Sequence, residues 1–573
     1  MAAGKHISSG FLNLEPSTPT LKTSFSVYSI KLHQHQQQKR SYQLCSSMSM
    51  NGCQSNPTIP LGIVETISLY PVSSPALAVD SLYSTISNLK SNLHYSNHSS
   101  GIIRIQVPIE GQIEARDWLH AQPHNHQFPR IFFSARRQFD GSGYFVDCIN
   151  GDGNVNGNDN SNSHDLISIA GVGAAVYFRH FRSFSFDDWR SIRRFLSKDC
   201  PLIRAYGAIR FDGEVEISEE WEPFGSFYFM VPQVEFNEFE GRSLLSVNVA
   251  WDSSLLCPWE EAMESLQENL DKVNFVASKS EKELPKALIR GEIAHIPDEK
   301  NWEIAVKTAL HMIRSSSALT KAVLARSSRI FTASDVDPLE WLACLQMEGN
   351  DAYQFLLQPP NAPAFIGNTP EQLFHRKKLT IWSEALAGTR ARCGSVALDH
   401  KTGLDLLSSP KDHLEFTIVR ESIRSKLEAV CDSVLVDPQK AIRKLPRVQH
   451  LYAKLKGRLR NEDDEFEILS SLHPTPAVCG FPSEDARCLI AETEKFDRGM
   501  YAGPIGWFGG EEAEFAVGIR SALVKKGFGA FVYAGTGIVE ASDPSLEWDE
   551  LDLKIAQFTK LLRLEIPILH TVA

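Results

Sequence analysis

Several features that define other classes of protein are missing or scarce in this chain of 573 residues. Its ten cysteines are scattered with no Cys-x-x-Cys pair, which indicates reduced thiols and offers neither a zinc site nor a disulfide framework. Positive charge is not in excess, and the formal net charge of -12 argues against a nucleic-acid partner. The longest apolar stretch, residues 167–178, is interrupted by serine and glycine and is too short to cross a bilayer, so no membrane partner is expected.

The features that are present are typical of a large folded enzyme. Apolar residues make up 43% and charged residues 22% of the chain. Its length exceeds what one ordinary core holds, which predicts a large two-lobed unit with extra segments. Strand-like patterns gather between residues 101 and 247, and helices and strands alternate from residue 301 onward. This distribution predicts an α+β fold of large antiparallel sheets flanked by helices.

The sequence divides into three predicted regions. Residues 1–50 are rich in Ser, Thr, Gln and His, carry five lysines and arginines against the single acid Glu15, and lack an apolar core. They are typical of a plastid transit peptide, which predicts the chloroplast stroma as the location; a disordered tail without an address is the alternative. Residues 60–290 form a strand-rich N-terminal region, interrupted by an Asn/Gly loop at 150–164. Residues 300–573 form the region that carries the candidate site.

One lysine occupies an unusual position, inside the apolar, strand-like run of residues 319–326. Strand alternation places Leu319, Lys321 and Val323 on one face. A lysine there must pair with an acid, extend to water or lose its charge, and a neutral amine at pH 7 is a general base. Two interpretations of Lys321 therefore stay open: an edge-strand lysine whose ammonium reaches water, and a catalytic base.

Carboxylates occur where they could hold a metal ion. Glu415 lies on or beside the apolar stripe of a predicted helix, so it either pairs with a cation or reaches water at the stripe's edge. Near the C-terminus, Glu547, Glu550 and Lys554 fall on one helix face. They form either a surface ladder of ion pairs or two oxygen ligands for Mg²⁺ plus a cation for an anionic substrate. Magnesium typically takes one or two protein carboxylates, so Glu415 and Glu550 would suffice.

Glu371 is a candidate general acid with a local pattern that argues against that role. Thr369-Pro370-Glu371-Gln372 has the form of a helix capping box. A helix start would lower the pKa of Glu371, whereas a general acid needs a raised pKa, so burial or a neighbouring carboxylate would have to prevail. Two glycine-rich segments are predicted as turns with backbone N–H groups that could bind carboxylates: residues 387–390, which end a strand, and residues 534–537, which follow one.

Together these segments resemble the chorismate-utilising enzyme family, which includes anthranilate synthase component I, and within it the isochorismate synthases. The resemblance runs from about residue 300 to the C-terminus, whereas the first 300 residues match weakly. It rests on ten motifs in order: Lys-Ala-Val-Leu-Ala-Arg (321–326), Gly-Asn-Thr-Pro-Glu (367–371), Leu-Ala-Gly-Thr-Arg (386–390), Lys-Asp-His-Leu-Glu (411–415), Val-Gln-His-Leu (448–451), His-Pro-Thr-Pro-Ala (473–477), Tyr-Ala-Gly-Pro-Ile-Gly-Trp (501–507), Ile-Arg (519–520), Ala-Gly-Thr-Gly-Ile-Val (534–539) and Glu-Trp-Asp-Glu (547–550).

The resemblance implies the fold of that family and a Mg²⁺-dependent isomerisation of chorismate to isochorismate. Lys321 would take a proton from the water that attacks C2, Glu371 would protonate the departing C4 hydroxyl, and His450 would orient the substrate. Glu415 and Glu550 would hold Mg²⁺, with Glu547 acting on the ion indirectly. The implied substrate-binding residues are Gly388, Thr389, Ala477, Tyr501, Arg520, Gly535 and Lys554.

Two of the motifs bear on the nucleophile. Family members that use ammonia lack a lysine at the position of Lys321 and differ at residues 473–476. Water must be deprotonated whereas ammonia need not be, so we expect water as the nucleophile and no glutaminase partner. Two alternatives stay open: a salicylate synthase, which would form isochorismate and then eliminate pyruvate, and a non-catalytic chorismate-binding regulatory protein.

Overall fold

The computed structural model describes ten stretches of the chain. They are residues 50–90, 93–123, 127–136, 166–274, 288–290, 293–315, 318–347, 352–392, 394–445 and 447–564. The predicted leader, apart from its last residue, and the Asn/Gly loop at 150–164 lie outside these residues, so both stay predictions. The elements described below belong to one compact unit of the chain, residues 48–573.

The strands of this unit form one sheet of 21 strands and a separate pair, β8 with β23. Within the large sheet, β1 and β2 pair in parallel, and the other paired strands run antiparallel. In chain order the strands are β1 (Ile63–Ser68), β2 (Ser100–Glu110), β3 (Arg130–Ser134), β4 (Leu166–His180), β5 (Ala205–Ile209), β6 (Phe227–Phe239), β7 (Arg242–Asp252), β8 (Leu288–Ile289), β9 (Ala294–Ile296), β10 (Lys321–Phe331), β11 (Tyr353–Gln358), β12 (Ala364–Thr369), β13 (Gln372–Lys377), β14 (Thr380–Ala391), β15 (Cys431–Val436), β16 (Ala441–Lys444), β17 (Val448–Leu459), β18 (Gly480–Phe481), β19 (Pro504–Phe508), β20 (Glu512–Val517), β21 (Ser521–Lys525), β22 (Gly529–Ile538) and β23 (Arg563–Leu564).

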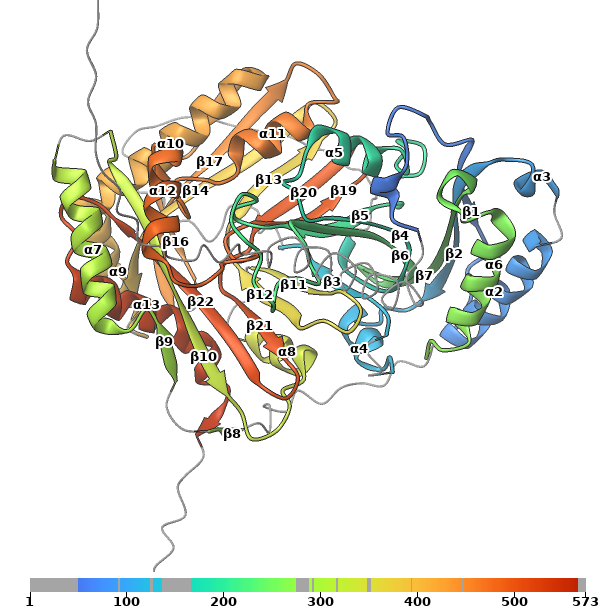
Figure 1. Ribbon diagram of the computed structural model, residues 1–573, viewed down its shortest axis with the longest axis horizontal. Helices are drawn as coiled ribbons and strands as arrows, with labels where there is room; N and C mark the ends of the chain where they lie inside the picture. Colours follow the sequence, from blue (N-terminus) through green and yellow to red (C-terminus); the bar gives the residue numbers. More distant parts are fainter. Residues whose placement is uncertain are drawn as a thin grey trace, which may run out of the picture. The chain divides into compact units, whose positions relative to one another are not determined.

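Helices cover this sheet, as Figure 1 shows. Helix α10 packs on β14 and β17, α13 packs on β22, and α7 packs on α13 and β10. Two short 3₁₀ helices, η1 (Gly52–Gln54) and η2 (Ser253–Leu255), complete the set. The α-helices are α2 (Pro75–Lys90), α3 (Leu93–Ser96), α4 (Ala115–His120), α5 (Phe186–Arg193), α6 (Trp259–Leu270), α7 (Glu299–Arg314), α8 (Pro338–Met347), α9 (Val396–Ser408), α10 (Pro410–Val430), α11 (Glu465–Leu472), α12 (Ser483–Thr493) and α13 (Pro544–Thr559).

The predicted α+β fold is confirmed, and so are the strands predicted from apolar runs. The stretch at residues 167–178 lies inside β4, which pairs with β6 along most of its length. Both strands are almost fully buried, which accounts for their nearly continuous apolar sequence. Lys321 opens β10, whose next residues pair with β22 from Ala322 to Phe331.

The sheet crosses the boundary between the two predicted regions. Strand β3, before residue 290, pairs with β11, and β5 pairs with β19. Residues from both regions therefore contribute to one continuous set of backbone hydrogen bonds. This junction lets side chains from residues 60–290 reach elements of the C-terminal region.

Three local predictions are wrong, each because tertiary packing overrides a local pattern. Thr369 does not cap a helix: it ends β12, and Gln372 begins β13, where its side chain donates to Tyr353 Oη over 2.6 Å. Residues 387–390 lie inside β14, where the pairing with β17 shifts register around Gly388 at φ +67°. Residues 534–537 continue β22 in full pairing with β10.

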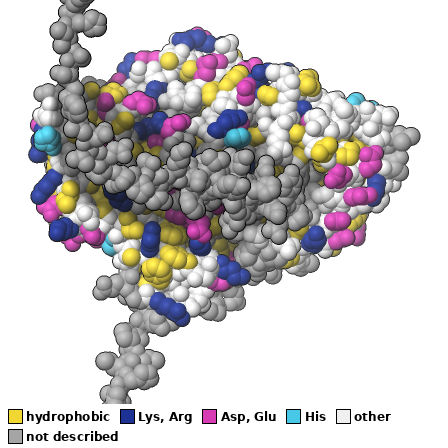
Figure 2. Space-filling model, in the orientation of Figure 1, with side chains coloured by type: hydrophobic (Ala, Val, Ile, Leu, Met, Phe, Trp, Pro, Cys, Tyr) yellow, Lys and Arg dark blue, Asp and Glu magenta, His cyan; other side chains and the backbone are white. Residues whose placement is uncertain are grey.

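In the described part of the chain, no helix is both long and apolar enough to span a membrane. Figure 2 shows basic and acidic side chains interspersed on the described surface of the face it presents.

Candidate active site

A cavity of about 710 Å³, part of it open to solvent, lies where strands β14, β17 and β22 meet helices α10 and α13. Its walls also include the connection between β12 and β13 and the loop before β21. The structure brings eleven of the thirteen predicted site residues to this cavity. They are Glu371, Gly388, Thr389, Glu415, His450, Ala477, Tyr501, Arg520, Gly535, Glu550 and Lys554.

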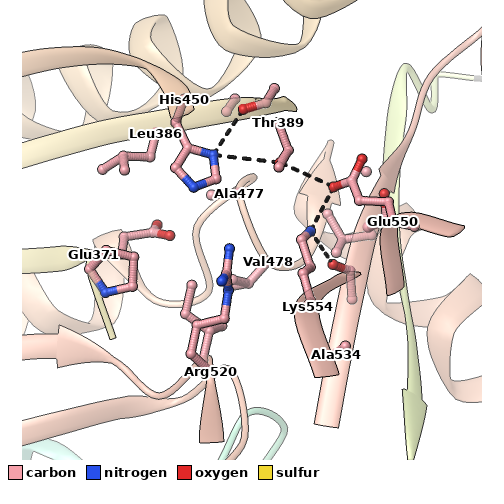
Figure 3. Close-up of a pocket in the computed structure, with 18 of the residues that line it drawn as sticks. Glu371, Leu386, Thr389, His450, Ala477, Val478, Arg520, Ala534, Glu550 and Lys554 are labelled. Atoms are coloured by element: carbon pink, nitrogen blue, oxygen red, sulfur yellow. Dashed lines mark hydrogen bonds and ion pairs between the residues drawn. The ribbon is translucent and has the colours of Figure 1, made fainter. Parts of the chain in front are cut away.

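The cavity has two different sides, as Figure 3 shows. Glu371 projects from one side, and Glu550 with Lys554 stands on the other. His450 and Arg520 face each other across the space between them. The arrangement surrounds the cavity with ionisable groups of both signs.

Lys321, one of the two residues that do not line the cavity, lies directly behind Glu415. Its side chain is fully buried, and its Nζ lies 3.0 Å from Glu415 Oε1, in an ion pair that lacks hydrogen-bond geometry. The interpretation of a lysine that reaches water is therefore wrong. Lys321 is instead paired with the carboxylate of Glu415, which is expected because an unpaired buried ammonium is costly.

Glycines make room for this pair and for the neighbouring tyrosine. A Cβ on Gly537 would lie 2.3 Å from Glu415 Oε1 and 2.9 Å from Lys321 Cε. A Cβ on Gly535 would lie 2.9 Å from Tyr501 Oη. Because these glycines occupy a paired strand, they serve close approach of side chains rather than a turn.

Helix α13 presents the other two candidate metal ligands. The Nζ of Lys554 lies 2.7 Å from Glu550 Oε1 and also donates to Gly535 O over 2.7 Å. Burial alone would raise the pKa of Glu550, but Lys554 and Lys411 outweigh it and lower that pKa to about 2. Glu550 is therefore ionised at any physiological pH, as a metal ligand must be.

Glu547, the second residue that does not line the cavity, is buried beside it. Its Oε1 lies 2.5 Å from Lys411 Nζ, and its Oε2 accepts a hydrogen bond of 2.6 Å from Thr536 Oγ1. Burial raises the pKa of Glu547, while the ion pair with Lys411 opposes that rise. Both carboxylate oxygens are thus engaged by protein groups, which supports an indirect role near a metal ion.

The donor set fits a hard cation that keeps most of its own ligands. Glu415 and Glu550 both line the cavity, from α10 and α13. Among the described residues, no three His, Cys, Asp or Glu side chains are grouped closely enough to cage a metal. Mg²⁺ in proteins is usually bound by one or two carboxylates, and water and substrate oxygens fill its remaining coordination positions.

Glu371 has the protonation behaviour of a general acid. It lies between β12 and β13 and not in the first turn of a helix, so the lowering of its pKa expected from a helix start does not apply. Burial raises its pKa, Lys321 lowers it and Glu384 raises it, with the result of about 7. In the described part of the chain no cation lies within ion-pair distance of its carboxyl. Burial therefore raises the pKa of Glu371 as a general acid requires, a condition that the sequence alone left open.

His450 is held as a neutral imidazole. Burial and Arg520 lower its pKa to about 3, although the hydrogen bond to Gly388 opposes this. Its Nδ1 lies 2.9 Å from Gly388 O, a pure acceptor, so Nδ1 carries the proton. Nε2 is then an acceptor, and it is buried without a partner. A substrate hydroxyl is the kind of group that could satisfy it.

Arg520 supplies a cation that no described carboxylate neutralises through an ion pair. Its backbone adopts φ +49°, a left-handed conformation that is strained for a residue with a side chain. Figure 3 shows its guanidinium directed into the cavity between Glu371 and Lys554. Tyr501 stays a neutral hydrogen-bond donor, because burial raises its pKa. Together they place a cation and a neutral hydrogen-bond donor in the cavity wall, groups of the kind that can bind a carboxylate.

Sequence reasoning missed several residues around the site. Lys411 precedes Glu415 by four residues, a spacing that signals a pair on one helix face. In the structure it contacts Glu547 instead. A buried cluster behind Glu371 is formed by Arg136, Glu384 and Arg443. It had no sequence signal, because Arg136 is 248 residues from Glu384 and Arg443 is 59 residues from it.

Comparisons with known proteins agree on one family. The family model described as "Chorismate binding enzyme" matches residues 159–563 and thus begins upstream of the ten motifs. A chloroplastic isochorismate synthase of Catharanthus roseus is 55% identical over 540 residues, 93% of each chain. Isochorismate synthase 2, chloroplastic, of Arabidopsis thaliana is 56% identical over 520 residues, 91% of this chain and 90% of its own. The solved structure of MenF, the menaquinone-specific isochorismate synthase from Escherichia coli, matches with a TM-score of 0.67 and 26% identity, covering 84% of this chain and 100% of its own.

Proposed function

The chain belongs to the chorismate-binding enzyme family, and from that premise we propose that its cavity converts chorismate to isochorismate by adding water at C2 and expelling the C4 hydroxyl. The protein is an enzyme of the isomerase class, and its location is the chloroplast, as for its plant relatives. One observation carries the proposal. Glu371, a buried carboxyl whose pKa is raised to about 7, lines the cavity, and the buried Lys321 lies behind another part of its wall, paired with Glu415.

The reaction needs one base and one acid, and each has a candidate. To act as a base, Lys321 would have to give up the ion-paired ammonium form seen beside Glu415; as a neutral amine it would take a proton from the attacking water, whose oxygen then bonds to C2. The ring double bonds would shift, and the C4–O bond would break as Glu371 gives its proton to the departing hydroxyl, which leaves as water. One water enters and one leaves, so the product is an isomer of the substrate. A protonated Glu371 at near-neutral pH is what this step requires.

The two carboxylates of chorismate would find separate partners. The guanidinium of Arg520, the hydroxyl of Tyr501 and the backbone of Gly535 would bind the enolpyruvyl carboxylate. Gly388 and Thr389 would lie beside the ring carboxylate, and Ala477 would form part of the apolar wall. The unpartnered Nε2 of His450 would accept a hydrogen bond from the substrate hydroxyl and so orient the ring.

Enzymes of this kind generally depend on a metal ion, and we propose Mg²⁺ held by Glu415 and Glu550. When bound, the ion supplies positive charge that holds the ring carboxylate. Glu547 would orient the site indirectly, because Lys411 and Thr536 already hold its two oxygens.

Charge balance explains why the ion and the substrate belong together. Three glutamates and three lysines pair around the cavity, so their charges cancel. A divalent cation alone or a dianion alone would add a net charge of two beside these three pairs, whereas the two together add none. Lys554, which the sequence suggested as a cation for the substrate, would act on it through Glu550 and Gly535.

Incubation of the purified full chain with chorismate and Mg²⁺, followed by chromatography and mass spectrometry, tests the proposal. We expect isochorismate as the enzyme-dependent product, and no aminated product when ammonium is added. Salicylate and pyruvate formed faster than isochorismate decays unaided would assign the chain to the salicylate synthases. An aminated product would overturn water as the nucleophile, and chorismate returned unchanged would favour a binding protein.

A further inference from the structure

A buried ion cluster lies behind Glu371, and the reaction proposed above makes no use of it. At its centre is Glu384 on β14, whose side chain is 1% exposed. Arg136 binds both oxygens of this carboxylate, with Nη2 at 2.5 Å from Oε1 and Nη1 at 2.7 Å from Oε2. Arg443 Nη1 donates to Oε2 over 3.1 Å, and Tyr452 Oη donates to Oε1 over 3.0 Å.

The same two guanidinium groups also bind the backbone next to the proposed acid. Arg136 Nη1 donates to Pro370 O over 3.0 Å, and Arg443 Nη1 donates to it over 3.1 Å. Pro370 lines the cavity and immediately precedes Glu371. Two cationic donors on one carbonyl oxygen define its position more tightly than a neutral hydrogen bond could.

The other side of Glu371 is held as well. Val517 N donates to Glu371 O over 3.0 Å, and Glu371 N donates to Thr369 Oγ1 over 3.3 Å. Both peptide groups that flank the Glu371 side chain are therefore anchored. Its carboxyl, by contrast, makes no ion pair with a described cation, so its direction depends on this anchored backbone.

Stability alone is a poor reason for such a cluster. Taking three charged side chains out of water is costly, and well-packed apolar residues often replace buried ion pairs without loss of stability. The three residues also come from distant parts of the chain: Arg136 follows β3, Glu384 is on β14 and Arg443 is on β16. The two arginines converge on the Pro370 carbonyl, and Glu384 accepts hydrogen bonds from both of them.

We propose that Arg136, Glu384 and Arg443 form a positioning cluster that holds the Pro370 carbonyl and thereby directs the Glu371 carboxyl at the substrate. The inference rests on the proposed role of Glu371 as the general acid. Arg136 belongs to residues 60–290, so the N-terminal region takes part in the reaction through this contact. Glu384 keeps the two guanidinium groups in place, and its negative charge also favours the proton on Glu371.

The test compares Arg136→Met and Glu384→Gln with the parent enzyme in steady-state kinetics. We expect kcat to fall by about 10- to 100-fold with KM near the parental value, because a misplacement on the order of 1 Å can cost about 100-fold in rate. Arg136→Lys should recover only part of the loss, since one ammonium cannot bind two carboxylate oxygens and a carbonyl together. Should Arg136→Met fail to fold, Glu384→Gln, which keeps the shape of the side chain, carries the same comparison.

A matched control separates positioning from general destabilisation. Arg104 and Glu235 form another fully buried ion pair, at 3.2 Å, and neither residue lines the cavity. Arg104→Met and Glu235→Gln should lower the unfolding temperature while kcat of the folded enzyme stays within about twofold of the parent. Equal losses of kcat in the control and cluster variants would overturn the inference.

A double-mutant cycle decides whether the cluster acts through Glu371. In a Glu371→Gln background, adding Arg136→Met or Glu384→Gln should change kcat by less than about twofold, because the group they position is gone. If Glu371→Gln lost activity but the cluster variants reduced kcat by the same factor in both backgrounds, only the inference would be overturned. If Glu371→Gln alone kept the parental kcat, both the proposed role of Glu371 and the inference about the cluster would be overturned.

Discussion

The two sides of the cavity hold their carboxylates in opposite ways. On the side formed by α10 and α13, which we call the metal side, Glu415, Glu547 and Glu550 each contact a lysine. On the opposite side, the acid side, Glu371 contacts no described cation within ion-pair distance. The metal side therefore pairs each of its carboxylates with a cation, and the pKa of Glu550 is lowered to about 2, whereas on the acid side burial raises the pKa of Glu371 and keeps a proton available for transfer.

A second comparison, within the acid side, shows that burial alone does not set the protonation state. Glu371 and Glu384 are both buried, at 5% and 2% exposed. Burial raises the pKa of each, yet Arg136 and Arg443 lower that of Glu384 to about 2, while that of Glu371 stays at about 7. The position of the guanidinium groups decides which glutamate is the acid and which is the anchor.

The largest expected effect is on the metal side, where removal of the ion should abolish activity. EDTA should stop turnover, and Mg²⁺ should restore it whereas Ca²⁺ should restore it poorly, because the larger ion fits a small octahedral site badly. Glu415→Gln and Glu550→Gln should each raise the Mg²⁺ concentration needed for half-maximal activity. Glu421→Gln, at a half-buried position on the same helix as Glu415 where the carboxylate pairs with Arg420, is the matched control. Ligand variants that titrate Mg²⁺ like the parent would place the ion elsewhere.

The next effect concerns the acid and the base together. Glu371→Gln and Lys321→Ala should each lower kcat by about 10²- to 10⁴-fold, the usual contribution of general acid–base catalysis. Chorismate affinity should persist in Glu371→Gln, because an amide resembles the protonated carboxyl. Lys321→Ala should bind Mg²⁺ at least as tightly as the parent, since no ammonium then competes for Glu415. Turnover near that of the parent in either variant would contradict the assignment.

A smaller effect should appear in stability, with opposite signs for the two acid-side glutamates. The folded pKa of Glu371 is raised from 4.5 to about 7, so its stabilisation is complete below pH 4.5 and is lost as pH rises to about 7. The folded pKa of Glu384 is lowered from 4.5 to about 2, so its stabilisation is complete above pH 4.5 and is lost as pH falls to about 2. Each shift corresponds to roughly 3 kcal/mol.

Urea unfolding across pH measures both slopes. The unfolding free energy of the parent should decline between pH 4.5 and 7, and Glu371→Gln should remove part of that decline. The stability of this variant relative to the parent should therefore increase as pH rises. Glu384→Gln should remove part of the acid-side decline below pH 4.5. Parallel curves for parent and variants over those intervals would show that neither glutamate has a shifted pKa.

Much of this comparison could be predicted from the sequence where the signal is local. Lys321 in an apolar strand, Glu415 on an amphipathic helix, and the 547-550-554 face were all visible as patterns, and the structure bears out each element. The order of the ten motifs then predicted which distant residues share a site. Eleven of them meet at the cavity because the strands and helices that carry them pack together there.

The remainder depended on contacts that no local pattern encodes. The glycines of residues 534–537 looked like a turn, because a sequence does not reveal that Tyr501 and Glu415 approach the strand there. Thr369 and Gln372 matched a helix cap, but Thr369 pairs with Tyr353 on β11, and Gln372 pairs with Ala516 on β20, far along the chain. The pKa of Glu371 depends on burial, and the Arg136–Glu384 pair joins residues 248 positions apart.

The smallest expected effect is a shift in the pH profile of kcat, and it tests the acid side alone. Turnover should fall about tenfold per pH unit above the pKa of Glu371, about 7, because the ionised carboxyl has no proton to give. Four charged groups act on Glu371: Lys321, Lys554 and Arg520 lower its pKa, and Glu384 raises it. Glu384→Gln removes the one of these four that favours the proton, so the pKa of Glu371 should fall and the basic limb should move to lower pH. The control Glu235→Gln should not shift the basic limb. If Glu384→Gln also left the basic limb unshifted, another group would supply the proton.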